Sequence, residues 1–163
     1  GNQARLLSPS GVHSPVALHS IPKLHYRNGR GAVLRMAVRV ASDGETASSG
    51  SYGVNWGLGT TDSRPFHGFG FYANDGEVGI WHNDPSSAGT SFEGRVPQGS
   101  WNGESITCDV SMMNVYEISY AWLGGGKLEW KIMDPITFTW KIVHTKIWTN
   151  TSITQILKYI LYF

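Results

Sequence analysis

The sequence predicts an all-β protein in which two antiparallel sheets pack face to face. Three runs of alternating residues between positions 114 and 150 carry this prediction, because successive side chains of a strand point to opposite faces. The 20 glycines and seven prolines indicate many turns between short strands. Seven Trp, seven Tyr and six Phe residues supply the large side chains that two facing sheets need in a shared core.

Length and charge narrow the class of protein further. The 163 residues suit one domain with a substantial core, and charged residues make up only 15% with a net charge of +1. No basic field is present, so we expect neither nucleic acid nor an anionic membrane surface as a partner. The one cysteine, Cys108, cannot form an internal disulfide and is expected to be a buried small side chain. A catalytic thiol has no local support.

The chain divides into three parts. Residues 1–22 are rich in Ser, Pro and Gly without a clear period and predict an irregular N-terminal arm. Residues 23–152 predict the β-sandwich domain. Residues 153–163 form a C-terminal tail whose apolar spacing fits a short helix, although its last six residues also resemble a terminal strand.

Alternating patterns predict four strands in the first half, over residues 32–42, 52–58, 66–73 and 77–82. Asn74-Asp75-Gly76 predicts a hairpin between the last two, and Phe69 and Phe71 share one face. Residues 91–98 and 106–110 are shorter strand candidates. Residues 99–103 predict a turn that places Trp101 outside the core.

Residues 114–150 predict a three-stranded meander with one aromatic face. Its runs place on that face Tyr116, Ile118, Tyr120 and Trp122, then Leu128, Trp130 and Ile132, then Phe138, Trp140 and Ile142. Gly124-Gly125-Gly126 and Asp134-Pro135 separate the runs. With the earlier segments the chain totals about eight to ten strands, which fits two packed sheets.

Few residues suggest chemistry. The glutamates are isolated from other acids at strand spacing, which disfavours a glycan hydrolase without excluding it. His67 and His82 lie near the ends of a predicted hairpin, and the loops carry oxygen ligands that calcium accepts, but both patterns are also ordinary strand ends and turns. We therefore expect no catalytic residue, cofactor or metal. An alternative function is the binding of sugars by aromatic stacking. The candidate residues are Trp81, Trp101 and Trp148, with Trp140 as a further candidate.

Several motifs, in this order, resemble a group of phage and large-DNA-virus structural proteins with a concanavalin-like jelly-roll domain. The pieces are YRNGRG at 26–31, GLG at 57–59, GFGFYANDGEVGIWH at 68–82, WNG at 101–103, NVYEISYAWLGGGKLEWKI at 114–132 and DPITFTWKIVHTKIWTNTS at 134–152. The residues after the last piece depart from the pattern of the group, which puts the final strand in doubt.

The resemblance implies a tail, fibre, baseplate or capsid-surface component of a virion that acts by protein–protein assembly. It implies no catalytic residues. Partners would be other virion proteins and further copies of the chain, with a trimer expected by analogy to fibres. The alternative is a carbohydrate-binding, lectin-like module, which could be the part of the same particle that binds a host glycan.

Overall fold

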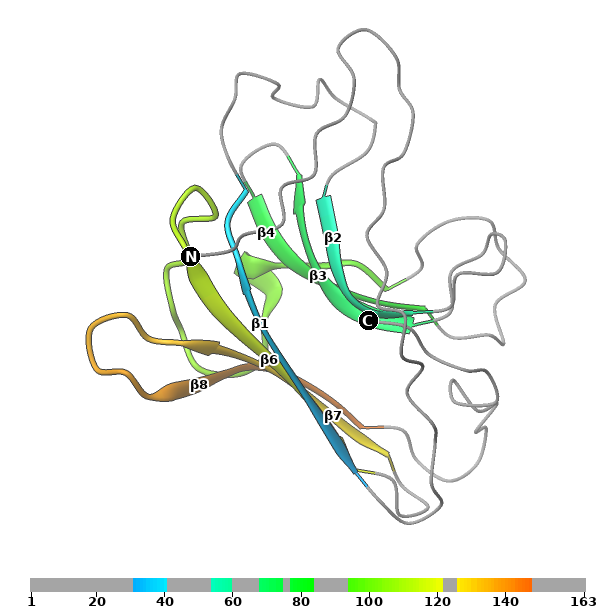
Figure 1. Cartoon of the computed structure of the whole chain (residues 1–163). Helices are drawn as coiled ribbons and strands as arrows, with labels where there is room; N and C mark the ends of the chain where they lie inside the picture. Colours follow the sequence, from blue (N-terminus) through cyan, green and yellow to red (C-terminus); the bar gives the residue numbers. More distant parts are fainter. Residues whose placement is uncertain are drawn as a thin grey trace, which may run out of the picture.

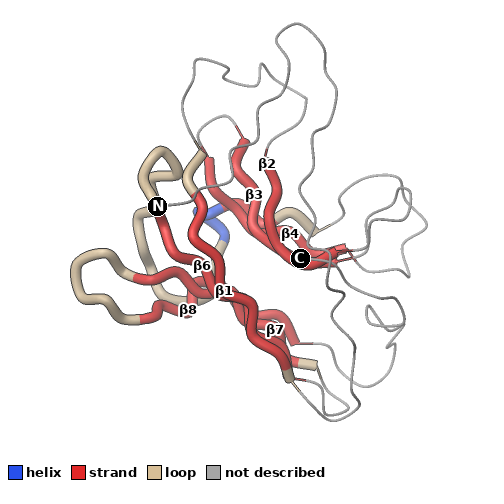
Figure 2. Tube along the Cα trace, in the orientation of Figure 1, coloured by secondary structure: helices blue, strands red, loops and turns tan. Residues whose placement is uncertain are grey.

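The protein is described by a computed structural model over residues 31–40, 54–59, 68–74, 77–83, 94–121 and 126–147. These residues form two antiparallel sheets of four strands each, which Figure 1 shows as two layers. Besides the strands they contain one short turn of 3-10 helix and no α-helix (Figure 2). The described part is therefore a β-sandwich, as predicted. The expected arm (1–22) and tail (153–163) lie outside the described residues.

Sheet 1 contains the predicted meander. Its strand order is β1-β6-β7-β8, with bounds β1 (Ala32–Val38), β6 (Asn114–Ala121), β7 (Lys127–Met133) and β8 (Trp140–Ile147). The distant strand β1 pairs with β6 in a register that sets Leu34 beside Ile118 and Arg35 beside Glu117. Paired residues share a face, so this register separates an apolar inner face from a charged outer face.

Sheet 2 is built from the middle of the chain. Its strand order is β2-β3-β4-β5, with bounds β2 (Val54–Gly59), β3 (Gly68–Asn74), β4 (Glu77–Asn83) and β5 (Val96–Pro97). Asn74 pairs with Glu77, which confirms the predicted hairpin between β3 and β4. A 3-10 turn, η1 (Gln98–Ser100), follows β5.

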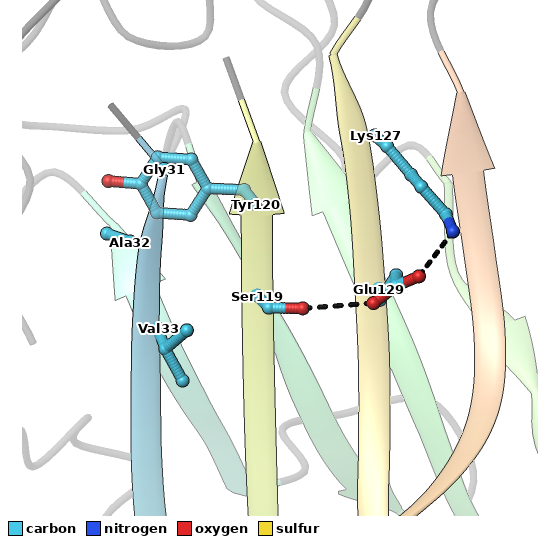
Figure 3. A pocket seen from close by; sticks show the side chains of 7 residues that line it. All are labelled: Gly31, Ala32, Val33, Ser119, Tyr120, Lys127 and Glu129. Carbon is cyan, nitrogen blue, oxygen red and sulfur yellow. Dashed lines mark hydrogen bonds and ion pairs between the residues drawn. The ribbon is translucent and has the colours of Figure 1, made fainter. Parts of the chain in front are cut away.

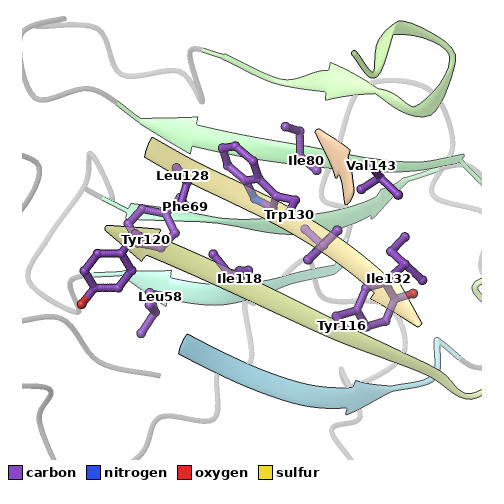
Figure 4. Packing of buried hydrophobic residues seen from close by; sticks show 11 residues of the cluster. Leu58, Phe69, Ile80, Tyr116, Ile118, Tyr120, Leu128, Trp130, Ile132 and Val143 are labelled. Carbon is purple, nitrogen blue, oxygen red and sulfur yellow. The ribbon is translucent and has the colours of Figure 1, made fainter. Parts of the chain in front are cut away.

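Side chains from both sheets fill the core (Figure 4). Phe71 of sheet 2 lies with its ring centroid 4.8 Å from that of Tyr116 in sheet 1, and Phe69 lies 5.5 Å from Tyr120. The residues of this cluster are Leu58, Phe69, Phe71, Ile80, Tyr116, Ile118, Tyr120, Leu128, Trp130, Ile132 and Val143. Burying side chains of this size contributes roughly 1.5–3 kcal/mol each. The core thus matches the inner faces predicted for the first two runs of the meander, except that Trp122 lies outside the described residues.

The third run of the meander was assigned to the wrong face. Phe138 is not in a strand, because β8 begins at Trp140. Met133 pairs with Trp140, so Trp140 lies on the outer face. The register then shifts between Trp130 and Lys131, and Val143 and His144 become the buried residues of β8. This irregularity reverses which residues face the core, and simple alternation cannot show it.

Three shorter predictions also need correction. The candidate strand at 106–110 is irregular backbone, held at its end by a bond from the Val40 N–H to the Val110 carbonyl (2.9 Å). The candidate at 91–98 contributes only β5 in the described residues. Trp101 is not outside the core but packs against it, and its Nε1 donates to the Val96 carbonyl at 3.3 Å.

The segment after Trp101 covers the outer edge of β8. The Asn102 side chain accepts from the Thr145 N–H (2.8 Å) and donates to the Thr145 carbonyl (2.9 Å), as a neighbouring strand would. Two backbone bonds follow, from the Gly103 N–H to the Val143 carbonyl (3.0 Å) and from the Glu104 N–H to the Ile142 carbonyl (2.7 Å). Between Ile142 and Thr145, the edge of β8 is thereby bonded inside the chain.

Candidate functional site

The connection between β7 and β8 is a tightly bonded loop that projects beyond the sheet (Figure 1). The Asp134 carboxylate accepts from the N–H groups of Ile136 (2.8 Å) and Thr137 (3.2 Å). The Asp134 N–H donates to the Thr139 carbonyl, and the Phe138 N–H donates to the Asp134 carbonyl, both at 2.9 Å. An aspartate that bonds the backbone two residues ahead is a common way to fix a turn. These four hydrogen bonds constrain the backbone of the loop.

This loop places two large apolar side chains in solvent. Ile136 is 85% exposed and Phe138 is 76% exposed. Phe138 has a φ of 56°, in the left-handed region that costs an L-residue with a side chain roughly 1–2 kcal/mol. The exposure of the two apolar side chains makes the folded state less stable. The strained backbone of Phe138 has the same effect. Strained backbone positions cluster at functional sites, so this loop is a candidate site.

A second loop carries two methionines. The Asp109 carboxylate accepts from the Ser111 N–H (2.9 Å) and from its hydroxyl (2.6 Å). The buried Asn114 amide donates to the carbonyls of Asp109 (2.7 Å) and Met112 (3.0 Å). In the loop that these bonds hold, Met112 is 63% exposed and Met113 is 49% exposed. This loop too is fixed by polar bonds and presents apolar side chains.

The two loops lie at the same end of sheet 1. Met112 and Met113 directly precede the first residue of β6, and Ile136 and Phe138 follow the last residue of β7. Because β6 and β7 are antiparallel neighbours, the start of one adjoins the end of the other. We call the four side chains of Met112, Met113, Ile136 and Phe138 the apolar end. Sequence reasoning missed all four, although apolar residues inside an Asp-led turn are a visible signal.

Two carboxylates and one guanidinium lie in or next to the segments that form the apolar end. Hydrogen bonds from the Ser111 side chain and backbone lower the pKa of Asp109, and backbone bonds from Ile136 and Thr137 lower that of Asp134. Both carboxylates are thus ionised at neutral pH. The exposed Arg39 follows the last residue of β1, and its neighbour Val40 is bonded to the methionine loop. An apolar centre with a polar rim is typical of protein interfaces.

The outer face of sheet 1 carries a network of ion pairs. Glu117 receives Arg35 Nε at 2.6 Å and Lys131 Nζ at 3.0 Å, and Lys131 also reaches Glu129 at 3.2 Å. The Arg35 guanidinium lies 5.3 Å from the centre of the Trp140 ring, which comes from the opposite edge strand. The network includes residues of all four strands, and its charged side chains are paired with one another.

Glu117 and Glu129 share Lys131 as a partner, so they are the two carboxylates to compare with the acid pair of a glycan hydrolase. Burial would raise the pKa of Glu117, yet the bonds from Arg35 and Lys131 outweigh burial and lower it. The bond from Lys127 lowers the pKa of Glu129, and the bond from Lys131 adds to the effect. A general acid needs a raised carboxyl pKa. These two carboxylates therefore do not make an acid–base pair.

A shallow depression of about 170 Å³ lies near the end of the outer face opposite the apolar end (Figure 3). Val33, Ser119 and the Lys127–Glu129 ion pair line it, with Glu129 also accepting from the Ser119 hydroxyl at 3.2 Å. These polar groups already satisfy each other. Their arrangement offers no convergent set of free groups for a small ligand.

The proposed sugar-stacking tryptophans do not form an open aromatic surface in the described residues. Trp81 is buried, covers Gly70 of the neighbouring strand and donates from Nε1 to the Phe71 carbonyl at 3.1 Å. Trp101 packs against the core. Trp140 is half-buried beside Arg35, and Trp148 lies outside the described residues. No two of the described candidates come together on one face.

The other reactive side chains are packed groups. The Cys108 sulfur lies 3.5 Å from the Tyr116 hydroxyl, and burial raises the pKa of both, so both stay neutral at pH 7. His144 is buried and accepts from the Asn102 N–H on Nδ1 at 3.3 Å. His82 lies near Trp130, and His67 is outside the described residues. Across the described ranges, no three His, Cys, Asp or Glu side chains cluster as a metal site requires.

Comparisons with known protein families, with curated proteins and with solved structures found no match to this chain. Within the described residues, no helix has the length and apolar character needed to cross a bilayer.

Proposed function

We propose that this chain is a structural component of a virus particle, acting by protein–protein assembly. The proposal takes its viral context from the sequence resemblance to tail, fibre, baseplate and capsid-surface proteins, together with the concanavalin-like jelly-roll connectivity that the resemblance implies. The β-sandwich of the described residues is compatible with that connectivity. Other virion proteins and further copies of the chain are the proposed partners, and the virion is the proposed location.

One observation supports the assembly mechanism above the others. The apolar end presents Ile136 and Phe138 at 85% and 76% exposure. Hydrogen bonds to the carboxylate and to the backbone of Asp134 constrain the loop that carries both residues. Rigid display of large side chains lowers the entropy lost on binding, because no loop must be ordered when the partner arrives. Aromatic side chains and methionines are enriched in the centres of protein interfaces.

The edges of sheet 1 support the same mechanism. The edge of β8 is covered by the segment that begins at Asn102. At the opposite edge, no strand among the described residues pairs with the outer side of β1. An edge of this kind can accept a strand from a neighbouring chain. The lectin-like alternative needs an open aromatic face, and no observation in the described residues favours it.

Mass spectrometry of particles purified from the source tests the proposal. The copy number of the chain is measured against that of the major coat protein. A fixed stoichiometry across independent preparations is the expected result. If the chain is absent from washed particles and present only in soluble fractions, the virion role is wrong, and a glycan-binding screen becomes the next experiment.

A further inference from the structure

We infer that the apolar end binds the apolar end of another copy of this chain. In this contact, the knob formed by Ile136 and Phe138 of one copy packs on the methionine pair, Met112 and Met113, of the next. The inference rests on the proposed assembly function and deepens it by naming the partner and the contact.

The four side chains of the apolar end divide into a knob, Ile136 and Phe138, and an adaptable acceptor, Met112 and Met113. Ile136 and Phe138 stand on a loop whose backbone is hydrogen-bonded at both ends, so the places where the two side chains leave the loop are fixed. Met112 and Met113 are unbranched and flexible, and methionine sulfur contacts aromatic rings favourably. A rigid aromatic group and a deformable sulfur-rich surface are complementary, and this chain presents both at one end.

The charged groups beside the apolar end also favour a second copy as the partner. Asp109 and Asp134 are ionised at the bases of the two loops, and Arg39 is exposed at the end of β1. When two such ends meet around a symmetry axis, the carboxylates of one copy can approach the guanidinium of the other. A rim that carries both signs can therefore complement itself.

The same charges argue against a bilayer as the occupant. Loops that insert into membranes usually combine apolar tips with lysines and arginines that meet anionic headgroups. Here the groups at the bases of the two loops are carboxylates, and Lys141 nearby is already paired with Glu104 at 3.0 Å. Anionic lipid would be repelled by these carboxylates, whereas another copy supplies both an apolar surface and a positive charge.

Geometry allows a closed assembly. The knob and the methionine pair come from different loops, so each copy can give its knob to one neighbour and its methionines to the same or another neighbour. A two-fold axis closes the contact when both groups meet the same neighbour. A three-fold axis is one way to close it when they meet different neighbours. The measured mass decides between a dimer and the trimer expected from the sequence.

Sedimentation velocity of the purified full chain over the micromolar range tests the inference. The unaltered chain is expected to form a dimer or trimer. Phe138→Gly is the sharpest variant, because glycine adopts the left-handed backbone of this position without strain, so the loop keeps its shape. Phe138→Gly and Ile136→Ser are each expected to weaken association about tenfold or more, as loss of an interface anchor does.

The matched control is Ile147→Ser, at the far end of β8, where the side chain is 61% exposed. This variant should associate as the unaltered chain does. Circular dichroism of every variant confirms that the fold is retained. Flotation with phosphatidylcholine vesicles and with vesicles containing phosphatidylserine runs in parallel.

Three results would overturn the inference. The first is a chain that stays monomeric throughout the range. The second is an oligomer that Phe138→Gly and Ile136→Ser leave unchanged. The third is a monomer that floats with either vesicle in a Phe138-dependent way, which would assign the loop to a bilayer. None of these bears on the copy number in particles, so a failed contact is distinguishable from a failed virion role.

Discussion

The indole Nε1 of Trp130 donates a 2.9 Å hydrogen bond to the carbonyl of Gly70 and so connects the two sheets through the core. Trp130 belongs to β7 and Gly70 to β3, 60 positions apart. The Trp130 side chain is fully buried, with His144 packed edge-on at 5.6 Å. This bond can form only when the two sheets are correctly placed relative to each other. It therefore helps to position sheet 1, which carries the loops of the apolar end.

Replacing Trp130 with Phe should destabilise the protein strongly. The variant removes the donor to the Gly70 carbonyl and leaves part of the indole volume empty. We expect a loss of about 2–4 kcal/mol in the free energy of unfolding, from the lost hydrogen bond and the cavity together. Urea unfolding measures it. Trp101→Phe is the control, since its bond to Val96 is longer and its side chain only half-buried, and it should cost less than half as much.

Gly103→Ala should detach the segment that covers the edge of β8. A Cβ at position 103 would collide with the Ile142 carbonyl oxygen, which would force the two backbone segments apart. We expect a lower melting temperature and faster aggregation, because the uncovered strand edge can pair with other chains. Gly99→Ala is the matched control, with no atom within 4 Å of its Cβ, and should change neither. Equal effects of the two substitutions would refute this role for Gly103.

The stability of the protein should fall on mild acidification because of His144. Burial lowers the pKa of His144 below its usual 6.5, and the nearby Lys146 lowers it further. As the pH drops below about 6.5, the unfolded chain takes up a proton that the folded chain does not, so the free energy of unfolding decreases. The decrease continues down to the folded-state pKa and then stops.

His144→Asn separates this titration from others. Asparagine can still accept from the Asn102 N–H, but it does not titrate. The variant should therefore lose less stability than the unaltered chain in urea titrations at successive pH values below 6.5. Parallel pH profiles for the two proteins would show that His144 contributes nothing to the pH dependence.

Phe138→Gly should leave the fold at least as stable as before. Relief of the left-handed strain is worth roughly 1–2 kcal/mol, while the added freedom of glycine in the unfolded chain costs about 0.4–1 kcal/mol. A net gain of about 0.5 kcal/mol is expected from these two opposing effects. Ile136→Gly, in the same loop and without positive φ, should instead lose about 0.5–1 kcal/mol. Thermal unfolding of the two variants measures these changes in stability. A loss of stability for Phe138→Gly as well as for Ile136→Gly would contradict the prediction.

Much of the fold could be predicted because its strands obey simple alternation. The alternation correctly indicated which residues are buried in β6, namely Tyr116, Ile118 and Tyr120. It did so for their paired residues in β7 as well. The hairpin at Asn74 followed from turn chemistry. Alternation failed at Phe138, because the turn extends to Thr139 and the later register shift returns Val143 to the core. A shift of register depends on neighbouring strands, so one strand read alone cannot reveal it.

The candidate site was less predictable than the fold. Trp81 is a large aromatic residue in a strand. Whether its ring is open to a ligand depends on the residue beside it in the paired strand. That residue is Gly70, and the Trp81 ring packs over it. Met112 and Phe138 were visible in the sequence, yet their exposure depends on the bonds of Asp109 and Asp134 to their own loops. Such local bonds hold an apolar side chain outward against its tendency to be buried.

Photocrosslinking in purified particles tests most directly whether the apolar end is an assembly contact. Phe138 is replaced by p-benzoylphenylalanine, with the same replacement at Ile147, which is also exposed, as the control. The proposed contact predicts that irradiation joins position 138 to a second copy of the chain, at a site near Met112 or Met113, while position 147 gives no such product. Product formation at position 147 but none at position 138 would contradict an assembly role for the apolar end.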